Sequence, residues 1–304
     1  MNNIQKKILI TGANGQLGKK LIDNIYNSEY KKVIELYCND IEDLDITNEI
    51  VLKRFLEENK FEIVINCAAY TNVDLAEDNY EVAKSINADA PRYLAKYTKQ
   101  TGGKLIHISS DYVFDGGKNT PYKEDDTPNP ISVYGKTKLI GEKNVMAENS
   151  DAIIIRTSWL YSEHGKNFLK TILRLSEEKE ELDVVFDQVG TPTYAGNLAA
   201  EILYICLNYI NLNNWYSGIY HYSDLGVCSW YDFACAIVEA KRNIKNKNIP
   251  IINPVLSENF PSKVKRPNYS VLDKSKIIKT YSSKISYWRD SCSNVVSMIE
   301  LNQN

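Results

Sequence analysis

The chain has 304 residues, a formal net charge of −3 at pH 7 and 25% charged residues, enough to bury a large core. Its Lys and Arg residues are scattered, which argues against a nucleic-acid partner, and no run of about 18 apolar residues predicts a membrane span. Six cysteines without metal-ligand spacing, and a polar turn too near the N-terminus for a signal peptide, predict buried free thiols in a cytoplasmic protein.

The first segment predicts a strand, a glycine-rich turn and a helix. Apolar residues 7–11 precede G-x-x-G-x-x-G, and an amphipathic pattern then runs to about Asn27. In a dinucleotide site the first glycine permits the turn, the second admits a pyrophosphate, and the third lets the helix pack closely. A turn that serves packing alone is the alternative. We expect these cofactor contacts: Gly12, Asn14, Gly15, Gln16, Leu17 and Gly18.

A second strand, residues 33–38, precedes Asp40. A carboxylate about 20 residues beyond the glycine motif accepts hydrogen bonds from the adenosine ribose and repels a 2′-phosphate, which favours NAD over NADP. A solvated loop aspartate is the alternative. Asp45 and Ile46 are expected beside the adenine, and Thr47 is expected to cap a helix that ends near Glu58.

The third and fourth strands, residues 62–67 and 104–109, end in further candidates. Ligands of open parallel sheets bind at the carboxyl ends of the strands. We therefore expect the Ser110 hydroxyl to bind a substrate carbonyl oxygen, with a turn-forming serine as the alternative. The predicted cofactor contacts here are Ala68, Ala69 and Tyr70, together with Asn87 in a helix over residues 80–99.

Tyr134 and Lys138 lie four residues apart in a predicted helix that ends near Asn149. This spacing places them on one helix face. A neighbouring ammonium would lower the pKa of the tyrosine and make the phenol a proton donor or acceptor. The same spacing is common on surface helices, so it gains meaning only from the segments around it.

A fifth strand, residues 152–156, completes alternating strands and helices that predict an α/β fold with a doubly wound parallel (Rossmann) sheet. The second half is less regular. Its expected helices cover residues 166–178, 194–207, 230–241 and 285–301, its expected strands cover 182–186 and 218–223, and residues 251–271 are expected to be mostly loop.

Taken together, the T-G-x-x-G-x-x-G motif, the strand-end serine and Tyr134-x-x-x-Lys138 resemble the extended short-chain dehydrogenase/reductase superfamily. More specific segments resemble, within it, the dTDP-4-dehydrorhamnose reductase family, and they span essentially the whole chain. They include Ser-Asp-Tyr-Val-Phe-Asp-Gly and Asp-Gln-Val-Gly-Thr-Pro-Thr, and they lie at residues 66–74, 109–116, 134–142, 156–159, 187–193 and 265–273.

The resemblance implies a reaction and roles for the residues. NADH or NADPH would reduce the C4 keto group of dTDP-4-dehydro-β-L-rhamnose, with Tyr134 as proton donor. Lys138 would lower the pKa of the tyrosine and hold the nicotinamide ribose, and Ser110, where threonine is usual, would bind the keto oxygen. Cys67 stands where alanine is usual. The implied contacts to the dTDP-linked keto-deoxy sugar are Ser110, Asp111, Tyr112, Trp159 and, for the diphosphate, Arg266, whose alternative is a surface arginine.

The resemblance further implies a Rossmann domain over residues 1–160, with the chain crossing back around 187–215, and a smaller substrate-binding domain over 161–304. Some family members bind Mg²⁺ through glutamates at a homodimer contact, but no ligands can be located in this sequence. Two other functions stay open. A related epimerase or dehydratase would use the same Tyr and Lys, although Asp111 is followed by Tyr112 rather than Glu, and a catalytically silent subunit usually loses the residues that are present here.

Overall fold

The computed structural model describes residues 5–245, 250–261 and 263–301. Its centre is a six-stranded parallel sheet with the strand order β2-β1-β3-β4-β5-β10. The strand order reverses direction between β1 and β3, which creates a crevice at the carboxyl ends of these strands. The strands are β1 Lys6–Thr11, β2 Ile34–Asn39, β3 Ile63–Asn66, β4 Lys104–Ser110, β5 Ile153–Thr157 and β10 Gly218–His221.

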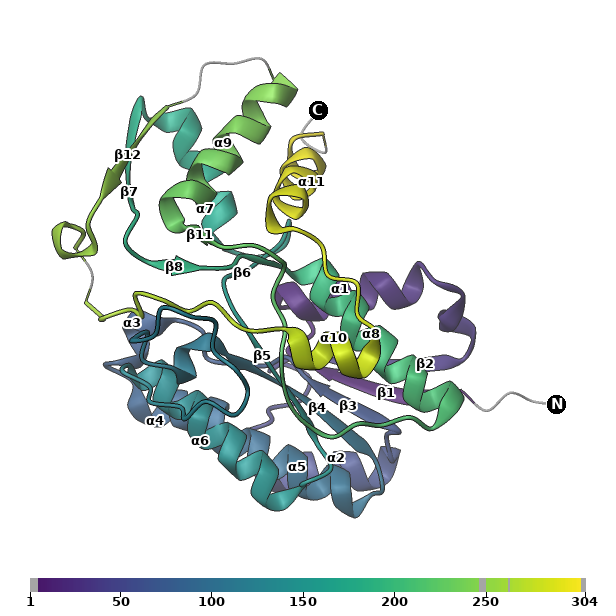
Figure 1. Ribbon diagram of the computed structural model, residues 1–304. Coiled ribbons are helices and arrows are strands. Elements are labelled where there is room, and N and C mark those ends of the chain that lie inside the picture. Colours follow the sequence, from purple (N-terminus) through teal and green to yellow (C-terminus); the bar gives the residue numbers. More distant parts are fainter. Residues whose placement is uncertain (1–4, 246–249, 262, 302–304) are drawn as a thin grey trace.

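Helices cover both faces of this sheet (Figure 1). Side chains alternate along a strand, so Ile8 and Ile10 belong to one cluster and Leu9 to another. The first cluster is closed by α1 Gln16–Tyr26 and α8 Ala195–Leu212, and the second by α2 Glu49–Asn59, α5 Ala90–Gln100 and α6 Val133–Glu148. The prediction of a doubly wound α/β fold is confirmed.

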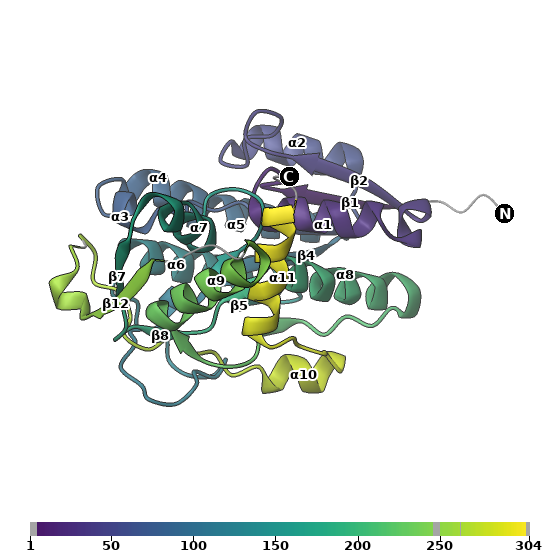
Figure 2. The same ribbon diagram turned by 90° about the horizontal axis from the view of Figure 1, so that it is seen from above.

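A separate apolar cluster lies in the second half of the chain, around the buried Phe233. In Figures 1 and 2 its strands β7 and β12 lie side by side at the opposite end of the molecule from β2. The elements are α7 Phe168–Glu178, α9 Trp230–Lys245, α11 Trp288–Leu301, β7 Glu181–Val185, β12 Ile251–Val255, and the short pairs β6 Leu160–Tyr161 with β9 Thr193–Tyr194 and β8 Val189–Gly190 with β11 Cys228–Ser229.

Four local predictions need correction. The segment expected to be loop forms β12 over Ile251–Val255, while Ser262 lies outside the described residues. Helix α10, Ser275–Tyr281, was not predicted. The helix expected over residues 80–99 is α4 Tyr80–Lys84, a π-helical turn Ser85–Asp89, and α5. Asn48, rather than Thr47, caps α2, because its Oδ1 accepts the Val51 amide.

The other short elements are α3 Val73–Ala76 and the 3₁₀ turns Glu29–Lys32, Asp111–Val113 and Ser257–Asn259. None of the described helices is long and apolar enough to cross a membrane.

Candidate active site

A cavity of about 810 Å³ opens at the carboxyl ends of the parallel strands. The glycine turn, the segment after β2 and the ends of β3, β4 and β5 form most of its wall. Residues from the second half of the chain, including Trp159, Trp230 and Arg266, complete it. Its position at the switch point of the sheet is where open α/β folds bind their ligands.

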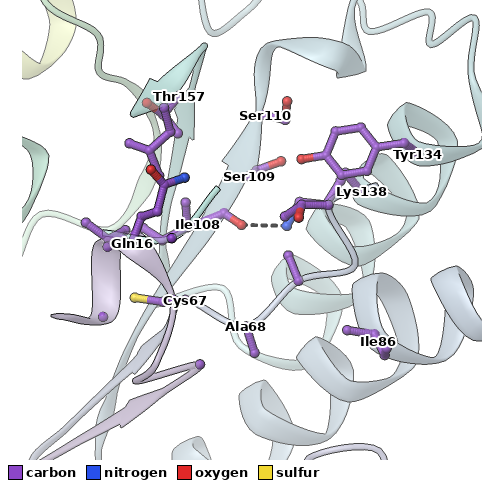
Figure 3. A pocket seen from close by; sticks show the side chains of 18 of the residues that line it. Gln16, Cys67, Ala68, Ile86, Ile108, Ser109, Ser110, Tyr134, Lys138 and Thr157 are labelled. Atoms are coloured by element: carbon purple, nitrogen blue, oxygen red, sulfur yellow. Dashed lines mark hydrogen bonds between the residues drawn. The ribbon is translucent and has the colours of Figure 1, made fainter. Parts of the chain in front are cut away.

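Ser110, Tyr134 and Lys138 all line one wall of this cavity. Figure 3 shows the Tyr134 side chain directed toward the serines at the end of β4. Ser132 caps α6 by accepting the Gly135 amide at 3.1 Å, so Tyr134 lies in the first turn of the helix. A Cβ on Gly135 would lie 2.1 Å from the Tyr112 carbonyl oxygen, so this glycine permits the close seat of α6 on the Asp111–Val113 turn.

The electrostatics of this pair differ from the sequence-based expectation. Lys138 donates its ammonium proton to the Ile108 carbonyl oxygen at 2.6 Å (Figure 3). Burial raises the pKa of Tyr134, opposed by a hydrogen bond with Ser110, and burial lowers the pKa of Lys138 to about 8. The pKa of Tyr134 therefore lies above, not below, its ordinary value in this structure, whereas the part of Lys138 in the reaction stays a prediction. Of these two groups, the lysine has the pKa nearer to neutrality.

Ser110 is fixed by its neighbours. Its hydroxyl donates to Asp111 Oδ1 at 2.9 Å and accepts the Tyr112 amide at 3.1 Å. Burial raises the pKa of Asp111 to about 6. The Tyr112 ring meets the Tyr134 ring edge-on, with centroids 5.5 Å apart. Asp111 and Tyr112 thus line the same wall as the Ser–Tyr–Lys trio.

The glycine turn forms another part of the wall. Gly12 has φ +67°, and a Cβ there would lie 2.7 Å from the Ala68 backbone, so only glycine fits. Gly15, Gln16, Leu17 and Gly18 also line the cavity. Free amides at the start of α1 can receive a pyrophosphate here.

Asn14 does not line the cavity; its amide instead donates to Asp40 Oδ2 at 2.9 Å. The other carboxylate oxygen of Asp40 accepts the Ile41 amide, also at 2.9 Å. These bonds orient the Asp40 carboxylate at the cavity edge, beside Asp45 and Ile46. Asn14 therefore acts through Asp40 rather than as a cavity contact.

Ala68 and Ala69 line the cavity as predicted, but Tyr70 and Asn87 do not. The fully buried Asn87 accepts the Tyr70 amide at 2.9 Å and donates to the Tyr70 carbonyl at 3.1 Å. It also donates to Thr137 Oγ1 at 3.2 Å. Asn87 thus connects the segment after β3 to α6 at Thr137, one residue before Lys138. It contacts residues next to the cavity but does not line the cavity itself.

The aromatic wall contains a residue that sequence reasoning missed. Trp159, with φ +47°, stacks on Trp230 with ring centroids 3.6 Å apart and planes 7° apart, and both rings line the cavity. Arg266 also lines it and donates to Asp74 Oδ2 at 3.1 Å. Trp230 begins a helix 71 residues beyond Trp159, and no sequence spacing signals that the two rings meet.

Several other lining residues were not predicted as contacts, although some of them lie in the segments that carry the family resemblance. They are Ile41, Leu44, Thr47, Cys67, Thr71, Val73, Ile86, Ile108, Ser109, Thr157, Ser158, Leu160, Gly165, Lys166 and Asn167.

Among the described residues, one group offers three metal-ligating side chains: Asp23, Glu163 and His164. The Lys20 ammonium lies 2.7 Å from Glu163 and 3.6 Å from Asp23. A cation of the protein itself therefore already offsets part of the charge of these two carboxylates, and the group by itself gives no reason to assign a Mg²⁺ site.

The Rossmann sheet, the glycine turn and the Ser–Tyr–Lys wall define the class as an NAD(P)-dependent oxidoreductase of the short-chain dehydrogenase/reductase type. A family model described as RmlD substrate binding domain matches residues 6–301. The dTDP-4-dehydrorhamnose reductase of Aggregatibacter actinomycetemcomitans is 39% identical over 295 residues, covering 97% of this chain and 99% of the relative. The chain belongs to the dTDP-4-dehydrorhamnose reductase family, as the resemblance predicted.

Solved structures agree. A dTDP-4-dehydrorhamnose reductase from Clostridium acetobutylicum matches with a TM-score of 0.88 and 41% identity, covering 97% of this chain and 99% of the other. The corresponding enzyme from Bacillus anthracis, solved in complex with NADP, matches with a TM-score of 0.87 and 36% identity, covering 97% and 100%. The fold therefore belongs to a known architecture.

Proposed function

We propose that the protein catalyses the NAD(P)H-dependent reduction of dTDP-4-dehydro-β-L-rhamnose to dTDP-L-rhamnose. One observation carries the proposal: Ser110, Tyr134 and Lys138 share one wall of a cavity that the glycine turn also lines. The names of the family relatives supply the substrate. Residues 1–160 would mainly hold the cofactor and residues 161–304 mainly the sugar nucleotide, with Arg266 and the Trp159 ring on the sugar side.

The roles follow from the contacts. A bound nicotinamide cofactor supplies the hydride that reaches C4 of the sugar. When substrate binds, the Ser110 hydroxyl turns its one proton from Asp111 Oδ1 to the keto oxygen, and the Tyr134 phenol, kept protonated by burial, delivers its proton to that oxygen. The Lys138 ammonium then stabilises the phenolate and binds the nicotinamide ribose. Because the phenol is the protonated form at neutral pH, the site starts in the state that reduction requires.

The adenosine end of the cavity bears on cofactor choice. Asp40 and Asp45 contribute carboxylates there, and the lining residues between 40 and 47 include no Lys or Arg. A 2′-phosphate would meet negative charge without a cationic partner. We therefore propose that NADH is preferred and that NADPH is also accepted.

The test is oxidation of NADH and of NADPH by the purified protein, with dTDP-4-dehydro-β-L-rhamnose generated in place. We expect cofactor oxidation with dTDP-L-rhamnose as product and a higher kcat/KM for NADH. Tight cofactor binding without oxidation would contradict the proposal. Other nucleotide-linked keto sugars would then be tested, and failure of that panel would favour a silent subunit on the same fold.

A further inference from the structure

Glu142 lies one helical turn beyond Lys138 and two beyond Tyr134, on the buried face of α6. Its side chain is 3% exposed and forms a bidentate ion pair with Arg156 on β5. Arg156 Nε donates to Glu142 Oε1 at 2.9 Å and Nη2 donates to Oε2 at 2.7 Å. The Ser109 hydroxyl on β4 also donates to Oε1. One carboxylate thus joins α6 to the ends of two strands.

The Arg156 guanidinium is itself enclosed. Its Nη1 lies 3.3 Å from His221 Nε2 on β10, and its carbon lies 5.1 Å from the Phe114 ring centroid. His221 Nδ1 donates to the Tyr122 carbonyl at 3.1 Å, which leaves Nε2 as the acceptor for Arg156. A buried ion pair with its hydrogen bonds satisfied holds its partners in one geometry.

The carboxyl ends of β4 and β5 also carry residues of the candidate active site. Ser109 lies between Ile108, whose carbonyl accepts the Lys138 ammonium, and Ser110. Thr157, Ser158 and Trp159, which follow Arg156, line the cavity. Glu142 therefore connects the helix that presents Tyr134 and Lys138 to both strands that complete the site.

We propose that Glu142 is a positioning residue of the proposed reductase: it holds α6 against β4 and β5, and its negative charge keeps Lys138 in the ammonium form directed at Ile108. This inference depends on the proposed function, because it assigns Glu142 a part in that reaction. Glu142 itself does not line the cavity, so it acts through Lys138 and Ser109.

Glu142, one turn further along α6, is the carboxylate that acts electrostatically on Lys138, and the Arg156 guanidinium bound to Glu142 carries the opposing charge. Cys67, at the end of β3, and His107, on β4, also act on Lys138 electrostatically. Burial raises the pKa of the Cys67 thiol and lowers the pKa of His107, so both are neutral at physiological pH. Burial lowers the pKa of Lys138 to about 8, and the charge of Glu142 opposes that shift.

The experiment is the pH profile of kcat/KM for wild type and for Glu142→Gln, which keeps the shape of the side chain and removes its charge. Without that charge, Lys138 loses its proton at lower pH. We expect the alkaline limb of the profile to move down by about one pH unit, with a loss of roughly fivefold at pH 8. At pH 6, where Lys138 remains charged, we expect a smaller loss than at pH 8, and that loss reports the weaker contact of α6 with β4 and β5.

Glu201→Gln is the matched control. Glu201 is also a buried glutamate that accepts a serine hydroxyl, from Ser283 at 2.7 Å, but it lies on α8 and does not line the cavity. We expect this variant to keep the wild-type pH profile, even where its melting temperature changes.

A loss in Glu142→Gln that is equal at all pH values, or an unshifted alkaline limb, would overturn the inference. If Glu142→Gln fails to fold, Glu142→Gln/Arg156→Gln removes the unpaired arginine, and the same profile is measured. In that double variant a negative and a positive charge are removed together, so the alkaline limb should lie near the wild-type position, and a displacement of a full pH unit or more would overturn the inference. Failure of the proposed function is distinguishable, because the wild type would then oxidise no cofactor with the substrate.

Discussion

Tyr134 and Lys138 lie one turn apart on α6, and burial moves their pKa values in opposite directions. Desolvation disfavours the charged form of each group, so the tyrosine stays a phenol and the lysine approaches neutrality with a pKa of about 8. At the scale of single residues, the protonation states in the site therefore depend on the exclusion of water as much as on the residue types. The protonated phenol suits a reductase, which must give a proton to its product.

Replacing Tyr134 with Phe removes this proton and leaves the ring in place. We expect kcat to fall by about 10²- to 10⁴-fold, because a positioned general acid contributes about that factor. The dissociation constant of NADH, measured by fluorescence titration, should stay within about twofold of wild type. Unchanged turnover would show that another group delivers the proton.

His221 predicts a pH dependence of stability. Burial, with Arg156 beside it, lowers the pKa of His221 from 6.5 to about 3. Between these values the unfolded chain binds a proton that the folded chain does not, so this residue destabilises the fold as pH falls from 6.5 towards 3. The slope is about 1.4 kcal/mol per pH unit. Urea unfolding of wild type and His221→Asn at pH 7, 6 and 5 should show a shallower loss for the variant, and equal slopes would refute this.

At the scale of elements, the fit between α6 and the π-helical turn Ser85–Asp89 decides where the catalytic helix lies. Asn87 in this turn donates to Thr137 Oγ1 at 3.2 Å. A Cβ on Gly141 would lie 2.0 Å from the Asn87 carbonyl oxygen, so the backbones approach as closely as glycine allows. The π turn thus brings the two helices together beside Lys138, which agrees with the frequent use of such turns at functional sites.

Gly141→Ala should therefore separate α6 from this turn. Backbone cannot move aside as a flexible side chain can, so we expect a loss of about 2–3 kcal/mol in the free energy of unfolding. The melting temperature and kcat should fall together, because α6 carries Tyr134 and Lys138. Gly117→Ala is the control: its Cβ would meet only the Asp115 side chain, at 3.4 Å or more, and a similar loss there would contradict the steric explanation.

At the scale of the whole molecule, the cavity is closed by bonds between its two halves. Gln16 Oε1, in the first turn of α1, accepts the Asn167 side-chain amide at 2.8 Å. Lys20, one turn further, pairs with Glu163 at 2.7 Å. Both partners precede α7 in the second half of the chain. The N-terminal end of α1 is therefore held by residues that lie about 150 positions away in the sequence.

Asn167→Ala should weaken this closure. Asn167 also caps α7 by accepting the Lys170 amide at 3.0 Å, so the variant should lose about 1 kcal/mol of stability from the cap alone. Because Gln16 lines the cavity, we expect KM for NADH to rise several-fold with a smaller change in kcat. Ser28→Ala removes the cap of the 3₁₀ turn after α1 and should leave KM unchanged. Equal KM values in wild type and Asn167→Ala would contradict the role in closure.

Sequence patterns predicted the central sheet because its strands are continuous apolar runs between turns, a pattern that depends only on local composition. Sequence patterns were less informative about the elements in the second half of the chain. Residues 251–271 were expected to be mostly loop, but β12, which contains Pro254, pairs with β7 in a two-stranded sheet, and an edge strand tolerates a proline that lacks an amide proton. Likewise, no local pattern separates Asn87, which supports the site from behind, from a residue that faces the cavity.

The sequence by itself determined the doubly wound fold, the glycine turn, and the Ser–Tyr–Lys trio with the family to which they belong. These features depend on residue types at short, regular spacings, and local spacing is visible in a sequence. Only the tertiary structure decided which groups are desolvated, that Lys138 binds Ile108, that Trp230 stacks on Trp159, and that Glu142 reaches Ser109 and Arg156. Burial and contacts between distant segments arise when separate elements pack, so no local pattern encodes them.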